Sequence, residues 1–232
     1  MKKDKFETKI ETRLEIVNEV ENDEAVLYLY GTIAENTWWN EDVITASGVK
    51  DALKEIKGKN LKVHLNSGGG DVFQSIAVHN LLKQFDGEVT IVIDALAGSG
   101  ASVIAMAGAK VQMPSNGMMM VHQASTYAYG NSTNFRKIAD DLDKIDTSVR
   151  ESYKTRFVGE EQELIDLIAE ATWLTAEECL AFGFCDEILT EAKEEPEVDN
   201  KLPIKVSLFE KYKVTASTKE TLLNKFKTGG IK

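Results

Sequence analysis

The feature that most constrains the fold is an alternation of short apolar runs with segments of helical spacing. The runs at 25–30, 61–65 and 89–93 have the length of core strands. Each is followed by a stretch whose apolar residues recur at helical intervals, which predicts helices over 45–56, from Asp71 onward, and over 99–107. Strands that alternate with helices of this length favour an α/β fold with a largely parallel sheet.

The second half of the sequence predicts further short strands and one long helix. Strands are expected at 110–113 and at 118–121, and a helix over 132–157. The apolar residues of that helix fall three or four apart and form one stripe: Phe135, Ile138, Leu142, Ile145, Val149 and Tyr153. Such a stripe suits either an intramolecular core or a partner surface. Another helix is expected over 160–169, and a last one from a capping box at Thr175–Glu178 to Gly183.

The 232 residues are enough for one domain with appendages. We expect residues 1–24 to form an N-terminal extension or edge strand and residues 25–190 to form the catalytic domain. Residues 191–232 begin with a strongly charged stretch that contains Pro196. That composition predicts a charged linker and a C-terminal tail.

Composition excludes several classes of partner and location. A formal net charge of −11 repels phosphate backbones, so we expect no nucleic-acid partner. The two cysteines form no C-x-x-C pair, which suits a reducing cytoplasm. The N-terminus lacks the apolar region of a signal peptide, and the low-charge run 95–109 is too short to span a bilayer. We therefore expect a cytoplasmic protein with no membrane partner.

The first candidate for chemistry is the glycine run Gly68–Gly70, which we expect to turn the chain between a strand and a helix. Glycines leave backbone amides unshielded, so such a place can bind an anion or a developing oxyanion. A tight turn without function is the alternative. A phosphate loop is excluded because no Lys-Ser/Thr pair follows.

The second candidate is Ser99 in the small-residue segment 97–101. A serine between a strand and a helix can present its hydroxyl to a carbonyl, and the Gly100 amide can stabilise the negative oxygen. The pattern is not Gly-x-Ser-x-Gly, so an α/β-hydrolase elbow is not indicated. The alternative is a helix N-cap serine, a role that Ser102 could also fill.

The third candidate is His122, where the run 118–121 leaves the core. An imidazole at a strand end can reach a neighbouring helix N-terminus and transfer protons near neutral pH. A purely structural histidine is the alternative. Of the other two histidines, His64 is expected within a strand and His79 on a helix.

Taken together, these segments resemble the Clp protease proteolytic subunit family, peptidase family S14. Residues 65–72 are similar to its Asn-Ser-Pro-Gly-Gly signature, with Gly68 in the proline's place. The resemblance continues through three further segments in the family's order: 97–110, 120–123 and 175–183. It implies an α/β fold of the Clp-protease/crotonase-like ββα superhelical type, in which the long helix 132–157 protrudes as a handle.

The resemblance also implies the chemistry. Ser99 would be the nucleophile, His122 the general base, and the amides of Gly69 and Gly100 the oxyanion hole. Protein or peptide substrates and a homo-oligomeric ring are implied as partners. The sequence contains no metal-ligand cluster and no nucleotide-binding motif, so we expect no metal and no cofactor.

A subgroup resembles the chain more closely: the Clp-related head maturation proteases of phages and prophages, which are thought to trim scaffold and capsid proteins. The segments that carry this resemblance are 28–31, Trp38–Trp39, 71–73, 102–108 and 172–174. The function expected from the sequence is therefore a serine endopeptidase that processes scaffold or capsid proteins.

The chain departs from the family at one important position. The family's triad aspartate falls two places before the aromatic residue of the closing motif, and Ala171 stands there. Three substitutes remain open: Glu170, a carboxylate such as Asp140 or Asp141, or a backbone carbonyl.

Two other functions stay open at this point. One is a catalytically weak or inactive assembly protein, because the triad aspartate is missing. The other is a crotonase-type acyl-CoA enzyme, which would share the architecture and a paired-amide oxyanion hole. That chemistry usually needs carboxylates near the site, whereas this sequence offers a serine and a histidine.

Overall fold

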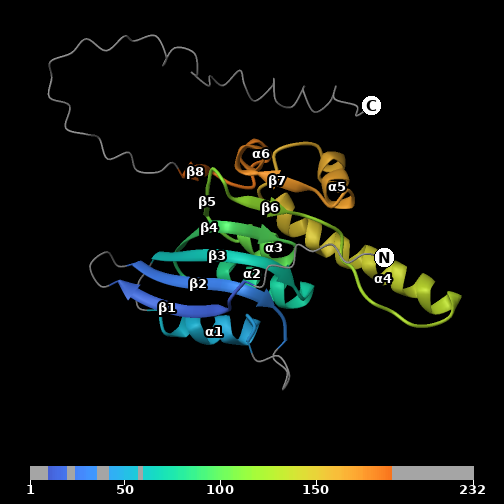
Figure 1. The fold of residues 1–232 in the computed structure, drawn as a ribbon, viewed down its shortest axis with the longest axis horizontal. Helices are drawn as coiled ribbons and strands as arrows, with labels where there is room; N and C mark the ends of the chain where they lie inside the picture. Colours follow the sequence, from blue (N-terminus) through green and yellow to red (C-terminus); the bar gives the residue numbers. More distant parts are fainter. Residues whose placement is uncertain (1–9, 20–23, 36–41, 57–59, 190–232) are drawn as a thin grey trace, which may run out of the picture. The chain divides into compact units, whose positions relative to one another are not determined.

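The computed structural model describes residues 10–19, 24–35, 42–56 and 60–189. Trp38, Trp39 and the predicted linker and tail 191–232 lie outside these residues, so the three-part organisation stays a prediction. The strands and helices, shown in Figure 1, are β1 Arg13–Glu19, β2 Glu24–Ile33, α1 Ala46–Lys54, β3 Asn60–Gly70, α2 Val72–Lys83, β4 Glu88–Gly98, α3 Gly100–Ala105, β5 Lys110–Pro114, β6 Met118–Met120, α4 Ser132–Lys154, α5 Glu161–Ala169, β7 Trp173–Thr175, α6 Ala176–Phe182 and β8 Glu187–Leu189.

The strands form one mixed, mainly parallel sheet in the order β1-β2-β3-β4-β5-β8. β1 pairs with β2 antiparallel, so the N-terminal segment supplies an edge strand. From β2 to β8 all neighbouring pairs are parallel. β6 pairs with β4 in parallel and with β7 antiparallel, off the main path. The α/β class expected from the alternating pattern is confirmed.

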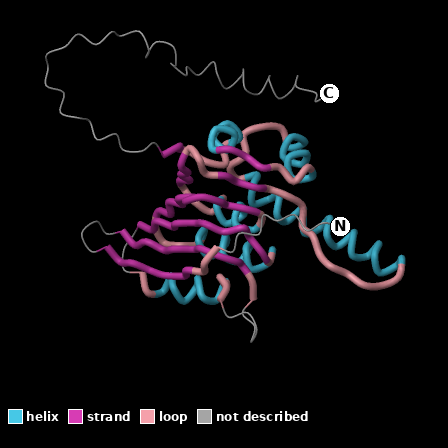
Figure 2. The backbone as a smooth tube through the Cα atoms, viewed as in Figure 1, coloured by secondary structure: helices cyan, strands magenta, loops and turns pink. Residues whose placement is uncertain are grey.

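Helices α1, α2 and α3 cover one side of the strand layer (Figures 1 and 2). Their starts follow the local sequence, since Thr45 caps α1 and Asp71 caps α2 through side-chain oxygens. The core between these helices and the sheet is made of aliphatic side chains that are almost fully buried, among them Leu27, Leu65, Val78, Ile93 and Ile104.

Strands β2, β3 and β4 are longer than expected, and for β3 and β4 the reason lies in their partners. β3 does not end in a turn: its glycines continue the strand, with Gly69 beside Thr32 and Gly70 beside Ile33 on β2. A Cβ added at Gly70 would lie 1.8 Å from the carbonyl oxygen of Ile33, so only glycine allows this pairing. The expected tight turn at Gly68–Gly70 is therefore wrong.

β4 continues beyond Ile93 to Gly98 and changes partner on the way. Its first half pairs with β5 and its last three residues pair with β6. The register with β3 shifts, because Leu65 pairs with Ile93 but Ser67 pairs with Ala97. The extra residues form a bulge, which bends the strand and redirects its end. This bend carries Ser99 away from β5 and toward β6.

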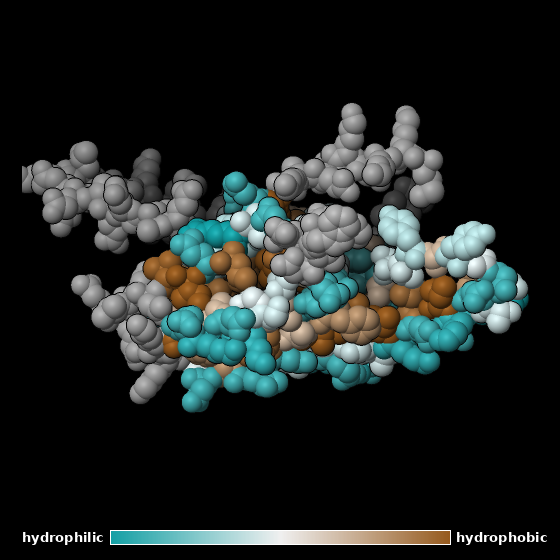
Figure 3. Space-filling model, turned by 90° about the horizontal axis from the view of Figure 1, so that it is seen from below, coloured by the Kyte–Doolittle hydropathy of each residue, from teal (hydrophilic) through white to brown (hydrophobic). Residues whose placement is uncertain are grey.

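The long helix α4 ends at Lys154, three residues earlier than expected, and its apolar stripe is used unevenly. Val149 and Tyr153 are buried in the core, whereas Ile138, Leu142 and Ile145 are partly exposed and Phe135 is 49% exposed. Figure 1 shows α4 extending away from the sheet. In Figure 3 hydrophobic atoms continue toward the side to which α4 extends. Only the C-terminal end of the stripe is therefore buried in the core.

The closing helix α6 follows its sequence signals. The hydroxyl of Thr175 accepts the N–H of Glu178, and the Glu178 carboxylate accepts the N–H of Thr175. Gly183 ends the helix with φ 79°, a left-handed conformation that glycine adopts without strain. The predicted capping box and helix end are confirmed.

Candidate active site

Ser99 and His122 come together because their strands are parallel neighbours. Gly98 at the end of β4 pairs with Met120 at the end of β6, and the N–H of Ser99 donates to the carbonyl of Met120. The carboxyl ends of parallel strands lie at the same sheet edge, so the residues that follow β4 and β6 meet there. Ser99 Oγ lies 2.7 Å from His122 Nε2. The two residues that the sequence singled out are thus in hydrogen-bond contact.

The backbone of Ser99 has a conformation that is unusual for a residue with a side chain, with φ 52° and ψ −124°. Such a conformation costs about 1–3 kcal/mol and persists only where the surroundings hold it. Ser99 precedes α3 but its side chain makes no capping bond, and Ser102 donates its hydroxyl to the Ser99 carbonyl. Ser99 thus occupies the N-cap position of α3 without side-chain capping, whereas Ser102 lies within the helix and is not its cap.

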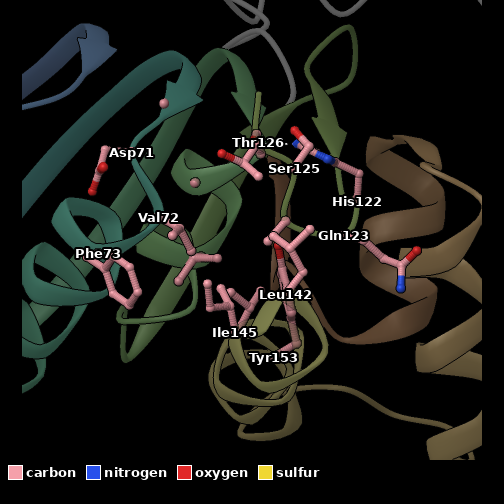
Figure 4. Close-up of a pocket in the computed structure, with 16 residues that line it drawn as sticks. Asp71, Val72, Phe73, His122, Gln123, Ser125, Thr126, Leu142, Ile145 and Tyr153 are labelled. Atoms are coloured by element: carbon pink, nitrogen blue, oxygen red, sulfur yellow. Dashed lines mark hydrogen bonds between the residues drawn. The ribbon is translucent and has the colours of Figure 1, made fainter. Parts of the chain in front are cut away.

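The Ser99–His122 contact opens into a pocket of about 510 Å³ (Figure 4). Asp71, Val72 and Phe73 lie on one side of it, and the chain after His122 lies on the other. Apolar side chains supply the floor, from Val72, Val103, Leu142, Ile145, Val149 and Tyr153. A pocket of this lining accommodates an apolar group beside the serine hydroxyl.

The two expected oxyanion amides lie close to Ser99 but differ in their present partners. A Cβ added at Gly69 would lie 2.7 Å from both Ser99 Cβ and the Gly100 nitrogen, so the two glycines are adjacent. The N–H of Gly69 donates to Ser67 Oγ at 3.0 Å. Gly100 is the first residue of α3, where an N–H has no acceptor within the helix. Gly100 is therefore the donor that is better prepared for a substrate oxygen.

None of the expected carboxylates orients His122 in the described part of the chain. Glu170 is exposed at the C-cap of α5. Asp141 pairs with Lys137 and Lys144, and the Lys137 ammonium is the main reason that its pKa lies below the ordinary value. Asp140 is exposed on α4. Among the described residues, the His122 side chain forms a hydrogen bond with Ser99 alone.

Ala171 lies in the turn between α5 and β7, next to the segment that pairs with β6. Met118 pairs with Thr175 and Met120 with Trp173, and the N–H of Val121 donates to the carbonyl of Thr172. Ala171 and His122 are therefore the neighbours of a hydrogen-bonded pair, and the N–H of Ala171 donates to the carbonyl of Ile168. Ala171 has φ 53°, a left-handed conformation that alanine rarely adopts.

The structure adds three polar groups near the site that sequence reasoning missed. Asp146 on α4 accepts the N–H of Ala124 at 2.6 Å, two residues after His122. The hydroxyls of Ser102 and Tyr153 lie 2.6 Å apart behind Ser99. The sequence held one weak signal, because Asp146 and Tyr153 lie on or beside the apolar stripe of the long helix.

The remaining histidines and the cysteines lie outside this arrangement. His79 is buried on α2, and His64 Nδ1 lies 2.9 Å from Asp94 Oδ1. Both cysteines are free and buried. Burial raises the pKa of the Cys185 thiol to about 11 and raises that of Cys179 as well, so neither is a ready thiolate. The candidate nucleophile of the described residues is Ser99.

The described residues contain no group of three or more His, Cys, Asp or Glu side chains placed to hold a metal ion. In the same part of the chain, no helix combines the length and the apolar character that crossing a membrane requires.

The fold and the site define a class: a mainly parallel α/β sheet whose edge holds a serine and a histidine in contact above an apolar pocket. The family model for Clp protease matches residues 15–192. The match covers more than half of the chain, and it includes every site residue discussed above. The chain belongs to the Clp protease family, and its fold is of the Clp-protease type expected from the sequence.

Curated relatives agree with this assignment. The ATP-dependent Clp protease proteolytic subunit of Leuconostoc citreum is 30% identical over 146 residues, which are 60% of this chain and 71% of that protein. Proteolytic subunit 2 of Thermobifida fusca is 29% identical over 140 residues, 59% of this chain and 68% of the relative. The subunit of Bacteroides fragilis is 26% identical over 149 residues, with shares of 57% and 65%.

Proposed function

We propose that this chain is a serine endopeptidase in which Ser99 is the nucleophile and His122 the general base. The observation that carries the proposal is the 2.7 Å contact between Ser99 Oγ and His122 Nε2 at the mouth of the pocket. A serine hydroxyl is a weak nucleophile until a base in hydrogen-bond contact removes its proton, and the imidazole is placed to do so.

The reaction would run in two halves. Ser99 Oγ attacks the peptide carbonyl while its proton passes to His122 Nε2, and the new oxyanion lies beside the amides of Gly100 and Gly69. His122 then returns the proton to the leaving amine, which releases one product and leaves an acyl-enzyme. Water, deprotonated by the same imidazole, hydrolyses that ester. For the Gly69 amide to take part, the substrate oxygen must replace Ser67 Oγ as its acceptor.

The pocket supports a preference for apolar side chains next to the cleaved bond. Its floor of aliphatic residues and Tyr153 lies beside Ser99, and Asp71 is the carboxylate among its lining residues. That carboxylate already accepts the N–H of Gln74 at the start of α2. An acyl-CoA enzyme would need a carboxylate at the reacting atoms, so the site favours peptide hydrolysis.

A fluorophosphonate probe, which phosphonylates activated serines with loss of fluoride, tests the proposal directly. The wild-type chain should take up the label, and Ser99→Ala and His122→Ala should not. Ser125→Ala, which removes another hydroxyl of the pocket lining, serves as the matched control and should be labelled like the wild type. Absence of label on the wild-type chain in every assembly state would refute the peptidase assignment.

We also propose that the substrates are scaffold or capsid proteins of a phage or prophage, which rests on the subgroup resemblance of the sequence. A portal gene before and a capsid gene after the coding sequence would support it. The decisive assay incubates the chain with that neighbouring capsid protein and looks for a new N-terminus by mass spectrometry. Cleavage by Ser99→Ala at the wild-type rate would contradict this role.

A homo-oligomeric ring is proposed as the working form. Its support is the partly exposed end of the α4 stripe, where Phe135 is 49% exposed, together with the fully exposed Tyr127 and Tyr129 in the preceding segment. Phe135→Asp should shift the sedimentation of the protein to smaller species and leave its circular dichroism unchanged. Unchanged sedimentation would remove α4 from the assembly surface.

A second candidate function is a catalytically silent assembly protein, and Ala171 is the observation that favours it. At the position of the family's triad aspartate the chain offers a methyl group in place of a carboxylate. This alternative predicts ring assembly without any Ser99-dependent labelling. The probe experiment therefore separates the two functions.

A further inference from the structure

The strained backbone of Ser99 is held by a buried chain of hydroxyl groups that begins on α4. Ser102 Oγ lies 2.5 Å from the Ser99 carbonyl oxygen and 2.6 Å from the hydroxyl of Tyr153. Ser102 is completely buried and Tyr153 is 1% exposed. Water therefore does not compete for these hydroxyl groups, and each must find its partners within the protein.

The direction of every proton in this chain follows from the partners. The carbonyl oxygen of Ser99 can only accept, so the single hydroxyl proton of Ser102 points toward it. The Ser102 oxygen is then free to accept, and the Tyr153 hydroxyl must be the donor. Burial raises the pKa of Tyr153, so the phenol keeps the proton that this arrangement needs.

The chain acts on the residue that carries the reactive hydroxyl. The carbonyl of Ser99 accepts from both the N–H and the hydroxyl of Ser102, and the N–H of Ser99 donates to Met120. These bonds fix the peptide groups on both sides of the positive-φ residue. The conformation of Ser99 in turn sets the direction of Oγ toward His122.

We propose that Ser102 and Tyr153 are positioning residues for Ser99: the phenol orients the Ser102 hydroxyl, which holds the nucleophile's backbone in its strained conformation. Neither residue touches the reacting atoms through its hydroxyl. Tyr153 lies fifty-four residues after Ser99 on α4, so the handle helix contributes to the geometry of the nucleophile. This inference rests on the proposed peptidase function.

The kinetic test measures the rate of Ser99 labelling by a fluorophosphonate and the kcat and KM for a peptide. Ser102→Ala should lower the labelling rate and kcat by about 10-fold, the factor expected for one hydrogen bond of ordinary net strength, with KM unchanged. Tyr153→Phe should give a smaller loss. The double variant should be no slower than Ser102→Ala, because both residues act through one hydroxyl.

Tyr30→Phe is the matched control. It also removes a tyrosine hydroxyl with a side-chain partner, since Tyr30 lies 2.5 Å from Asp94, but this pair lies apart from the pocket lining. Its labelling rate should equal that of the wild type, even where its melting temperature falls. Wild-type rates in Ser102→Ala and Tyr153→Phe, or losses that multiply in the double variant, would overturn the positioning role.

A crystal structure of Ser102→Ala separates this inference from the proposed function. The inference requires the contact between Ser99 Oγ and His122 Nε2, now 2.7 Å, to lengthen beyond hydrogen-bond distance in that variant. An unchanged contact would overturn it. If the wild-type chain takes no label, the peptidase function fails, and this comparison alone decides whether the two hydroxyls position Ser99.

Discussion

Ala171→Asp should convert the dyad into a triad and raise the rate of peptide hydrolysis. The N–H of Val121 donates to the carbonyl of Thr172, so position 171 follows directly on a bond to the residue before His122. We expect a carboxylate at this position to accept the second ring N–H of His122. Ala171 has φ 53°, and aspartate tolerates this conformation better than alanine does. The substitution should therefore add no backbone strain.

The expected gain lies between two limits. A single hydrogen bond to a charged group contributes about 1.5–3 kcal/mol, which corresponds to roughly 10- to 150-fold in rate. Complete restoration of the orienting acid would give about 10⁴-fold, the loss seen when the triad aspartate is neutralised in the serine-protease template. We expect kcat to rise by at least 10-fold, because the bond between Val121 and Thr172 holds the two neighbouring positions 122 and 171 in the same region.

The assay compares kcat for a fluorogenic peptide in the wild type, Ala171→Asp and Ala171→Asn. Asparagine matches aspartate in shape and in tolerance of positive φ, but it brings no negative charge. The asparagine variant should stay within about threefold of the wild type, since it cannot stabilise the imidazolium. Equal rates in all three proteins, while His122→Ala still abolishes labelling, would refute the assignment of position 171 as the partner of His122.

Three other perturbations follow from the same structure. Gly69→Ala should destabilise the fold by about 3 kcal/mol or more in chemical denaturation, because its Cβ would lie 2.5 Å from the Gly98 carbonyl oxygen at φ 90°. Gly68→Ala has open space and should change stability by less than 1 kcal/mol; similar losses in both variants would contradict the steric explanation. Asp146→Ala should raise KM and cost about 1–3 kcal/mol of stability, because it leaves the Ala124 N–H without its acceptor. Asp146→Asn keeps an acceptor oxygen and should leave KM and stability at their wild-type values. Unchanged peptide kinetics in Asp146→Ala would show that Asp146 does not position the segment after His122. Burial lowers the pKa of His79, so the unfolded chain binds more protons than the fold as the pH falls below about 6.5. Stability present above that pH should be lost on acidification. In His79→Gln, the free energy of unfolding measured across pH 5–8 should depend less steeply on pH than in the wild type. An equally steep dependence would assign the acid sensitivity to other groups.

Local sequence patterns predicted correctly which segments form strands and helices. They missed features that depend on pairing between strands distant in the sequence. The strands at 61–65 and 89–93 were found from apolar runs, and α6 from its capping box and Gly183. The extension of β3 through Gly68–Gly70 could not be read locally, because glycine also favours turns. Its strand character comes from pairing with β2, whose register no local pattern specifies.

The candidate site divides in the same way. Ser99 and His122 stood out because each lies next to a recognisable strand end, and the parallel pairing of β4 with β6 brings them into contact. No motif assigns a role in the site to Asp146, Ser102 or Tyr153. Their roles depend on where α4 packs, and the stripe pattern showed only that one face of this helix was apolar. Polar groups beside such a face are found only when their partners are known.

Sequence and structure together show that, within the described ranges of the chain, the carboxylate expected to orient His122 is missing. The sequence located the departure at Ala171 but left three substitutes open. The fold removes Glu170, Asp140 and Asp141 as hydrogen-bond partners of His122, because each is exposed or paired elsewhere among the described residues. It also shows that α4 supports both sides of the dyad, through Tyr153 and Ser102 behind Ser99 and through Asp146 beside the His122 segment. Geometry set by α4 can hold a serine and a histidine 2.7 Å apart, but it supplies no charge to stabilise an imidazolium. A slow, well-positioned dyad that a single carboxylate at position 171 accelerates is therefore what this arrangement of residues predicts.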